Sequence, residues 1–231
     1  MSRLRTLVQL ATADAACTEA KAAGAGWLSA DERLRYSELS TAAGRHRYLA
    51  AHWLARRALA AFTAVDACCW RLHRSPAGRP LAARLDGLSA PHISLTHSGR
   101  LVACAVSNLP VGIDLEMPVH RRDLLAMAGM VCNESERRHL AALDEPGQAD
   151  SFYRYWTLKE AWLKRDGNGI DPDRMRRLQA ERTERGGNAR TWQSEEAWLA
   201  VAVDDVARLE LESAGTFRPT GSWRLTLSAG S

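Results

Sequence analysis

Two kinds of hydrophobic spacing alternate along the first half of the chain. Residues 4–10 have the alternation of a strand, and an alanine-rich helix is expected after them. In residues 45–62, Leu49 and Trp53 recur at helical spacing opposite several arginines, which predicts a long amphipathic helix. Residues 92–116 contain three short apolar segments separated by turn residues, and these predict three strands.

Helix signals and weaker strand signals fill the rest of the chain. Ser29 followed by Glu32 has the spacing of a capping box, which predicts a helix start. Residues 118–150 return to helical spacing, and residues 150–169 predict another long helix that a glycine closes near its end. The last strands are weaker, and residues 185–190, Arg-Gly-Gly-Asn-Ala-Arg, are expected to form a hairpin turn there.

A faint internal symmetry relates the two halves of the chain. Each half has a long helix with basic residues, a turn-rich stretch and a strand of small residues, and segments 101–106 and 198–203 look like counterparts. We therefore expect an α+β fold, a pseudodimer of two similar α+β halves, residues 1–117 and 118–231. The cleft between such halves is a natural place for a ligand.

Composition and charge narrow the classes of protein and partner. The 231 residues are 46% hydrophobic and 25% charged, which suits a globular protein, and no apolar run is long enough to span a membrane. The first residues lack a secretory apolar stretch, and five cysteines without paired spacing argue against disulfides and zinc, so a cytoplasmic location is expected. The net charge of +4 favours an acidic partner: nucleic acid, a phosphate-rich cofactor or an acidic protein.

The strand at 111–116, Val-Gly-Ile-Asp-Leu-Glu, carries two acids on one face. Side chains alternate along a strand, so Gly112, Asp114 and Glu116 face away from the three large apolar residues. Two neighbouring carboxylates repel each other unless water or a cation separates them. By itself the pattern also describes a half-buried strand with its acids in solvent, and a site needs a third acid.

That third acid lies on the second long predicted helix. Trp156, Glu160 and Lys164 follow at i, i+4 and i+8, which places them on one stripe. Taken alone, the last two could be a pair that stabilises the helix by about 0.2–0.5 kcal/mol. Taken with Asp114 and Glu116, they supply three carboxylates and a lysine, a set that suits Mg²⁺ and a phosphate group.

Two polar turns add groups that could hold phosphate. Thr96, His97 and Ser98 end a predicted strand, where hydroxyls and an imidazole gather. Arg79, in a Gly-Arg-Pro turn, offers another cation. Each turn taken alone also fits an ordinary polar turn.

These segments together resemble the 4′-phosphopantetheinyl transferase superfamily, in particular its large pseudodimeric branch that activates peptide and polyketide synthases. The resemblance rests on two signatures, Gly-Ile-Asp-Leu-Glu at 112–116 and Trp-Thr-Leu-Lys-Glu-Ala-Trp-Leu-Lys at 156–164. The turns at 78–80 and 96–98 match weaker family features, and the similarity covers roughly residues 28–203.

The resemblance implies a Mg²⁺-dependent reaction. The phosphopantetheine arm of coenzyme A moves to a serine of an apo acyl or peptidyl carrier protein, and 3′,5′-ADP is released. Asp114, Glu116 and Glu160 are then expected to bind the metal. Glu160 is also expected to help deprotonate the carrier serine, Lys164 to steady the pyrophosphate, and Lys159 to act as a second cation.

The same resemblance implies how coenzyme A, the substrate, is held. Thr96 and His97 are expected to hold its phosphates, Arg79 and Pro80 to border the adenine, and Arg47 to lie near the 3′-phosphate.

Several positions depart from the family pattern: Thr96 stands where serine is usual, Arg79 where lysine is usual, and Val131 where an aromatic residue is common. Glu32 stands where some relatives carry a phosphate-binding lysine, and the flanking Arg33 and Arg35 could substitute for it. The sequence leaves open which carrier or pathway is served and whether acyl-coenzyme A is accepted.

A basic and apolar segment after the acidic strand is the expected contact with an acidic carrier. Arg121 and Arg122 come first, and Met127, Met130 and Val131 follow at spacings that could form one exposed helical face. We expect the protein to be a monomer that binds neither nucleic acid nor a membrane.

Two rival functions stay open at this point. A non-enzymatic basic module that binds nucleic acid or an acidic protein explains the charge but gives the three acids no role. Another magnesium-dependent phosphotransferase is the second rival, although the chain has no Walker-type loop and no kinase signature.

Overall fold

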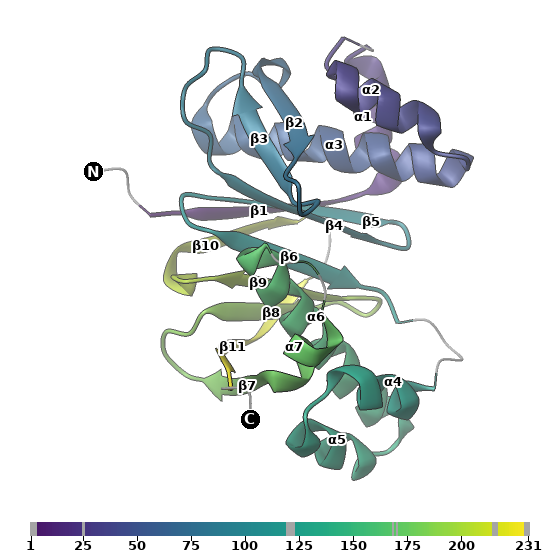
Figure 1. Cartoon of the computed structure of the whole chain (residues 1–231), viewed down its shortest axis with the longest axis vertical. Helices are drawn as coiled ribbons and strands as arrows, with labels where there is room; N and C mark the ends of the chain where they lie inside the picture. The colour runs from purple at the N-terminus through teal and green to yellow at the C-terminus, as the bar shows by residue number, and fades with distance from the viewer. Residues whose placement is uncertain are drawn as a thin grey trace.

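Two β-sheets packed face to face lie at the centre of the protein, with helices on both outer sides (Figure 1). The structure is a computed structural model. It describes residues 4–24, 26–118, 123–167, 169, 171–213 and 217–228.

The first sheet contains β1 (Thr6–Thr12), β4 (His92–Ser98), β5 (Leu101–Ser107) and β10 (Leu209–Ser213) in the order β10-β1-β5-β4. Helices α1 (Ala13–Ala22) and α3 (Ala42–Thr63) cover its outer face. Strand β5 is buried on both faces. Val102 and Cys104 pack under these helices, whereas Leu101 and Ala103 face the second sheet. A strand that is apolar on both faces requires a layer on each side of its sheet.

The second sheet contains β6 (Val111–Glu116), β7 (Leu178–Thr183), β8 (Ala189–Gln193), β9 (Trp198–Val203) and β11 (Arg218–Leu227) in the order β6-β9-β8-β11-β7. Helix α6 (Glu145–Asp166) covers its outer face. Strand β9 repeats the pattern of β5, because Ala200 and Ala202 lie under α6 while Leu199 and Val201 face the first sheet. The layer order is therefore helix, sheet, sheet, helix.

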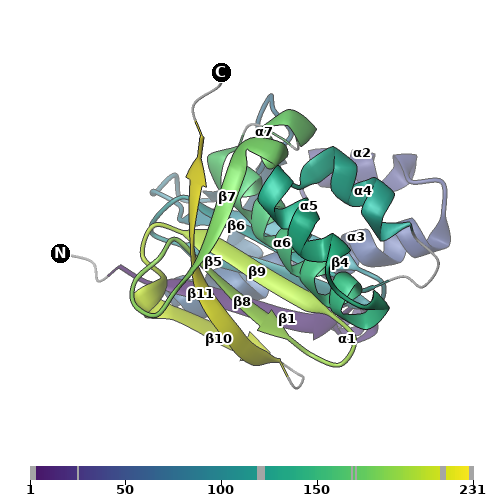
Figure 2. The same cartoon turned by 90° about the horizontal axis from the view of Figure 1, so that it is seen from below.

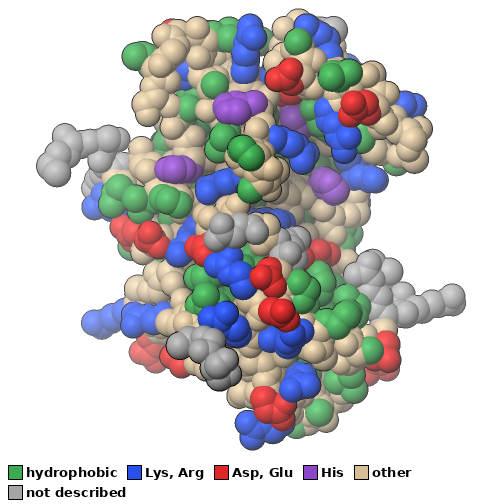
Figure 3. Space-filling view, in the orientation of Figure 1, with side chains coloured by type: hydrophobic (Ala, Val, Ile, Leu, Met, Phe, Trp, Pro, Cys, Tyr) green, Lys and Arg blue, Asp and Glu red, His purple; other side chains and the backbone are tan. Residues whose placement is uncertain are grey.

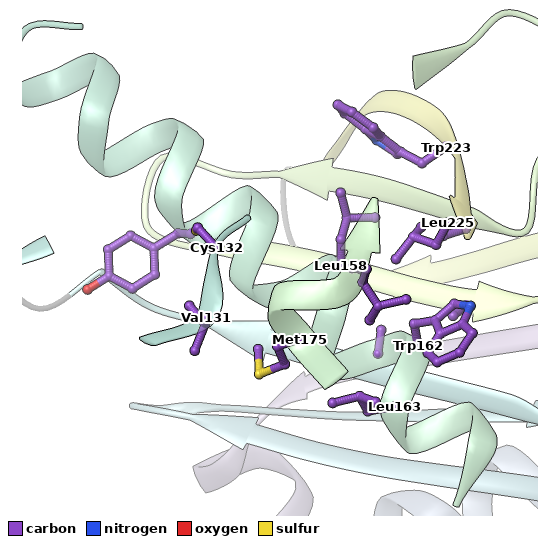
Figure 4. Packing of buried hydrophobic residues seen from close by; sticks show 14 of the residues in the cluster. Val131, Cys132, Leu158, Trp162, Leu163, Met175, Trp223 and Leu225 are labelled. Carbon is purple, nitrogen blue, oxygen red and sulfur yellow. The ribbon is translucent and has the colours of Figure 1, made fainter. Parts of the chain in front are cut away.

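Three short helices, α4 (Leu124–Val131), α5 (Glu134–Ala141) and α7 (Pro172–Arg177), lie beside α6 (Figure 2). They share its core, in which Val131 and Met175 belong to the same buried cluster as Leu158, Trp162 and Leu163 (Figure 4). Within the residues that the structure describes, no helix combines the length and the apolar character needed to cross a membrane.

A separate hairpin stands above the first sheet (Figure 1). It consists of β2 (Trp70–Arg74) and β3 (Pro80–Arg84), which form a two-stranded sheet of their own. Helix α2 (Ala30–Glu38) lies beside α3, and two short 3-10 helices, η1 (Ala67–Cys69) and η2 (Val206–Arg208), precede β2 and β10. The sequence predicted the turn of this hairpin but not its two strands.

The α+β class predicted from the sequence is confirmed, and the internal symmetry has a structural counterpart. Each sheet is covered by a 22-residue helix, α3 or α6, and segments 101–106 and 198–203 are interior strands of the two sheets. The predicted capping box is present, since Ser29 accepts from the Glu32 amide and Glu32 accepts from the Ser29 amide.

The predicted hairpin turn at residues 185–190 is wrong. This segment joins β7 and β8, but β11 lies between these strands in the sheet. Strand β11 comes from the end of the chain. The turn residues at 185–190 therefore could not indicate that β11 would lie between β7 and β8.

Strands cross the boundary predicted at residue 117. Strand β6 precedes it and belongs to the second sheet, while β10 follows it and belongs to the first. Each predicted half thus contributes one strand to the sheet of the other. The division of the chain into two halves, residues 1–117 and 118–231, stays a prediction.

Strand β6 and helix α6 approach each other closely at Gly112. A Cβ atom on Gly112 would lie 1.9 Å from the Ala161 carbonyl oxygen and 2.4 Å from the Arg165 amide nitrogen. Both are backbone atoms, so a side chain there would force the helix away from the strand. Glu160 and Lys164 directly precede these two contact residues, and Asp114 lies two positions along the strand. The missing side chain therefore brings the acidic and basic groups together.

We predict that Gly112→Ala lowers the free energy of unfolding by about 3 kcal/mol or more, because overpacking against backbone cannot be relieved by a rotamer change. Urea denaturation would measure the loss. Gly129→Ala is the matched control, because a Cβ at this position in α4 meets nothing within 4 Å. That substitution should raise stability by about 0.5–1 kcal/mol, the usual gain for glycine to alanine inside a helix. Equal effects of the two changes would contradict the close approach.

Candidate active site

Strands β4 and β6 meet at the seam between the two sheets through serine side chains. The Ser94 hydroxyl accepts from the Ile113 amide at 3.1 Å, and the Ser98 hydroxyl accepts from the Met117 amide at 3.0 Å. These bonds replace a backbone ladder and align the polar turn of β4 with the acidic face of β6.

The seam brings the predicted acids next to hydroxyl groups. Thr96 Oγ1 donates to Asp114 Oδ1 at 3.3 Å, and Ser98 Oγ donates to Glu116 Oε2 at 3.3 Å. Asp114 is 2% exposed, so the reading of this strand as one with solvated acids does not hold for it. A carboxylate this deeply buried requires a cationic or hydrogen-bonding partner.

Helix α6 supplies that partner and the third acid. The Lys164 ammonium lies 2.5 Å from Asp114 Oδ1 and 3.5 Å from Glu160 Oε2. Glu160 is 6% exposed. The predicted stripe of Glu160 and Lys164 therefore faces β6, and the group formed by Asp114, Glu116, Glu160 and Lys164 is called the acidic cluster below.

The acidic cluster holds more negative charge than Lys164 balances. Burial, followed by the charge of Asp114, raises the pKa of Glu160 to about 8. Burial works to lower the pKa of Lys164, but the charges of Asp114 and Glu160 outweigh it and leave that pKa raised. Asp114 Oδ2 is buried and has no hydrogen-bond partner among the described residues. These are the signs of a site that a further cation would stabilise.

The donor set of the acidic cluster fits Mg²⁺ by its chemistry. All three acids offer hard carboxylate oxygens, and Asp114 Oδ2 is a buried acceptor to which no described residue donates a hydrogen bond. In the described part of the chain, no three or more His, Cys, Asp or Glu side chains are already arranged as a metal site. The Lys164 ammonium occupies the space beside Asp114, so the metal assignment stays a prediction.

A cleft of about 850 Å³ leads to the acidic cluster. Four residues that the resemblance assigned to coenzyme A line it: Arg47, Pro80, Thr96 and His97. Thr96 also bonds Asp114, so the cleft and the acidic cluster meet at this residue. Figure 3 shows Lys, Arg and His side chains over the upper part of this face, around the hairpin and α3.

The cleft has basic and aromatic residues that sequence reasoning missed. Tyr48 and His52, whose rings stack with centroids 3.9 Å apart, come from α3, and His73 and Arg74 come from β2. Their signals were present, because Tyr48 directly follows Arg47 on the same helix and Arg74 precedes the predicted turn. The strand that orients Arg74 had not been predicted.

His97 lies in a positive environment. Burial lowers its pKa, and the nearby charges of Arg47 and Lys164 lower it further. The ring is therefore a neutral hydrogen-bonding group between two cations, a place where an anion such as phosphate would be stabilised.

Glu32 does not put an uncompensated charge into the cleft. Its carboxylate accepts from Arg56 at 2.6 Å and lies 2.7 Å from the His52 ring. Burial favours a raised pKa, but the bonds from His52 and Arg56 outweigh it and lower the pKa of Glu32 to about 2. Of its two neighbours, Arg35 lines the cleft, whereas Arg33 donates to the Leu28 carbonyl.

Lys159 does not lie in the cleft, which corrects its predicted role as a cation for coenzyme A. It is fully buried, and its ammonium donates to Glu136 at 2.5 Å and to the carbonyls of Val131 and Met175. An ammonium has three donors, and all three are used. Lys159 thus ties α4, α5 and α7 to α6.

Arg79 also departs from its predicted place at the adenine. Gly78 and Pro80 line the cleft on either side of it, but its own guanidinium donates to the Arg165 carbonyl at 3.2 Å. The side chain is therefore directed toward the end of α6.

The segment that contains β6 and α6 is similar to a known protein family. The model of the 4′-phosphopantetheinyl transferase superfamily matches residues 110–213, which include β6 and α6. The resemblance noted from the two signatures is thus confirmed.

Individual relatives agree with the family match. The chain is 32% identical over 127 residues to 4′-phosphopantetheinyl transferase Sfp of Bacillus subtilis (strain 168), which is 54% of each chain. It is 31% identical over 147 residues to 4′-phosphopantetheinyl transferase HetI of Nostoc sp., which is 63% of this chain and 62% of that one. The chain thus matches between about half and two thirds of the length of these curated relatives.

We predict that Lys159→Met lowers the free energy of unfolding by about 3–5 kcal/mol, because it leaves Glu136 buried without its cation. Chemical denaturation would measure the change. Adding Glu136→Gln, which removes the charge and keeps the helix cap, should recover part of the loss. Coenzyme A affinity of folded Lys159→Met, measured by calorimetry, should equal that of the unchanged protein. A stable Lys159→Met variant with weakened coenzyme A affinity would show that Lys159 contributes to coenzyme A binding after all.

Proposed function

We propose that this protein transfers the 4′-phosphopantetheine arm of coenzyme A to a serine of an apo carrier protein. The observation that carries the proposal is the junction of two features at Thr96. This residue lines a basic cleft large enough for a nucleotide, and it also bonds Asp114 of the cluster of three carboxylates and a lysine, in which Asp114 and Glu160 are buried. The family of residues 110–213 and the names of its relatives support the same activity.

Asp114, Glu116 and Glu160 are the residues that would hold Mg²⁺. When bound, the metal supplies positive charge to the pyrophosphate oxygens as negative charge builds on the leaving group. The choice of Mg²⁺ rests on the all-oxygen donor set and on Asp114 Oδ2, which has no hydrogen-bond donor among the described residues.

The reaction needs a proton acceptor and a charge at the phosphate. The carrier serine oxygen forms a bond to the phosphorus of the pantetheine phosphate, and the bond from that phosphorus to the oxygen of 3′,5′-ADP breaks. Glu160 is the carboxylate placed to accept the serine proton. Lys164, within 3.5 Å of Glu160, balances charge on the departing 3′,5′-ADP.

The cleft residues hold the rest of coenzyme A. Thr96 and His97 lie nearest the acidic cluster and are assigned to the phosphates. Pro80 is assigned to the adenine, and Arg47 to the 3′-phosphate with Arg35 as a further cation on the same wall.

The predicted carrier contact is altered by the structure. Val131 is 4% exposed and belongs to the core, and Met127 is partly buried against that core, so the three residues do not form one exposed apolar face. Met130 is 54% exposed and remains available. Arg121 and Arg122 lie outside the described residues. The monomeric state, the cytoplasmic location and the absence of nucleic-acid binding stay predictions.

We predict that Asp114→Asn slows phosphopantetheine transfer by at least about 100-fold, because it removes a charge from the centre of the acidic cluster. The measurement is mass spectrometry of apo carrier proteins after incubation with coenzyme A and Mg²⁺. Binding of Mn²⁺ in the presence of coenzyme A, followed by electron paramagnetic resonance, should weaken in parallel. Glu210→Gln is a control, since Glu210 pairs with Arg5 on the surface. Near-normal transfer by Asp114→Asn would show that the acidic cluster is not the active site.

We predict that His97→Ala weakens coenzyme A binding by about 10- to 100-fold, the equivalent of losing one hydrogen bond to a charged group. Calorimetric titration without carrier would measure it. His139→Ala is the control, because His139 is exposed on α5, which is absent from the cleft lining. If His97→Ala left coenzyme A binding intact but reduced binding to a DNA duplex, the basic-module rival would be favoured.

A further inference from the structure

The β2–β3 hairpin forms one wall of the cleft without belonging to either main sheet. Its backbone ladder pairs only its own two strands. Leu72, His73, Arg74, Gly78 and Pro80 of this hairpin line the cleft. The position of the wall relative to the acidic cluster therefore depends on side-chain contacts and not on a continuous sheet.

Arg79, at the tip of the hairpin, makes such a contact. Its Nη1 donates to the Arg165 carbonyl at 3.2 Å, and its Nη2 lies 3.5 Å from the Val111 carbonyl oxygen. Arg165 directly follows Lys164 on α6, and Val111 begins the strand that carries Asp114. One guanidinium thus contacts the backbone of both elements that build the acidic cluster.

The partner of Arg79 on α6 suits a cation. Helix α6 ends at Asp166, so the Arg165 carbonyl belongs to its last turn, where the helix dipole is negative. Gly167 caps the helix with φ of +78°, and a Cβ there would lie 3.2 Å from Arg79 Nη1. The glycine cap leaves room for the guanidinium to lie against the helix end.

The turn holds the base of Arg79 in place. Its amide donates to Ser75 Oγ at 3.1 Å, and its carbonyl accepts from the Ser75 amide at 2.9 Å. Gly78, with φ of +82°, gives the preceding backbone its left-handed conformation. The long side chain therefore leaves the tip from a defined point and reaches the other sheet's helix.

We infer that Arg79 is a positioning residue that latches the hairpin to α6 and β6. It sets the spacing between the cleft wall and the acidic cluster, and it does so without touching coenzyme A. This inference rests on the proposed transferase function for its consequence, but the latch itself is a property of the protein alone. It replaces the adenine contact that the sequence suggested for Arg79.

The decisive experiment is hydrogen exchange of the protein without coenzyme A. Arg79→Ala should speed exchange of the Ser75 and Gly78 amides at least tenfold, because the hairpin tip loses its anchor. Arg84→Ala is the matched control. Arg84 lies on the same hairpin, but its guanidinium pairs with Asp86 at 2.5 Å. Unchanged exchange in Arg79→Ala would overturn the latch whether or not the protein is a transferase.

Conservative variants separate the latch from a direct contact with substrate. Arg79→Gln retains a donor but not the fork, and should give intermediate exchange; a thermal melt would confirm that both variants fold. In transfer assays, Arg79→Ala should raise KM for coenzyme A and also lower kcat, since a displaced wall misaligns the bound arm. A raised KM with unchanged kcat and normal exchange would restore the direct adenine contact and refute the inference.

Discussion

The approach of β6 to α6 at Gly112 is the constraint on which the site depends. The strand and the helix touch through backbone atoms, and the residues just before the two contact points are Glu160 and Lys164. A larger residue at 112 would move the helix outward and separate these side chains from Asp114. The same close approach holds α6 against the second sheet, where the helix packs into the hydrophobic core shown in Figure 4. The geometry of the site and the stability of the fold therefore depend on the same contact.

Electrostatics divide the site into two regions that meet at β4. The acidic cluster is partly buried and has more carboxylates than cations, whereas the cleft is lined by Arg35, Arg47 and Arg74. A ligand that carries both phosphates and a bound metal complements the two regions together. A basic module that binds nucleic acid would use the second region and leave the first without a role.

Lys159 and Arg79, two cations of the family-like motifs, bond to the protein's own helices instead of lining the cleft. Lys159 and Lys164 are five positions apart on α6, which turns them about 140° from each other around a helix. Lys164 therefore faces β6, while Lys159 faces the short helices and saturates its three donors there. This difference was available from helical periodicity. The direction of Arg79 was not, because it depends on where the end of α6 lies relative to a turn 86 residues earlier.

Local patterns in the sequence determined much of this protein. The alternation in 111–116, the stripe of Glu160 and Lys164, the capping box at Ser29 and the two long helices could all be read because each depends on neighbours within a few residues. Tertiary structure decided what those patterns face. Strand β11 enters between β7 and β8, β6 joins the second sheet, and Glu32 finds Arg56 as its partner. These outcomes depend on contacts between distant segments, whose free energy is set by packing and burial, and no local spacing encodes them.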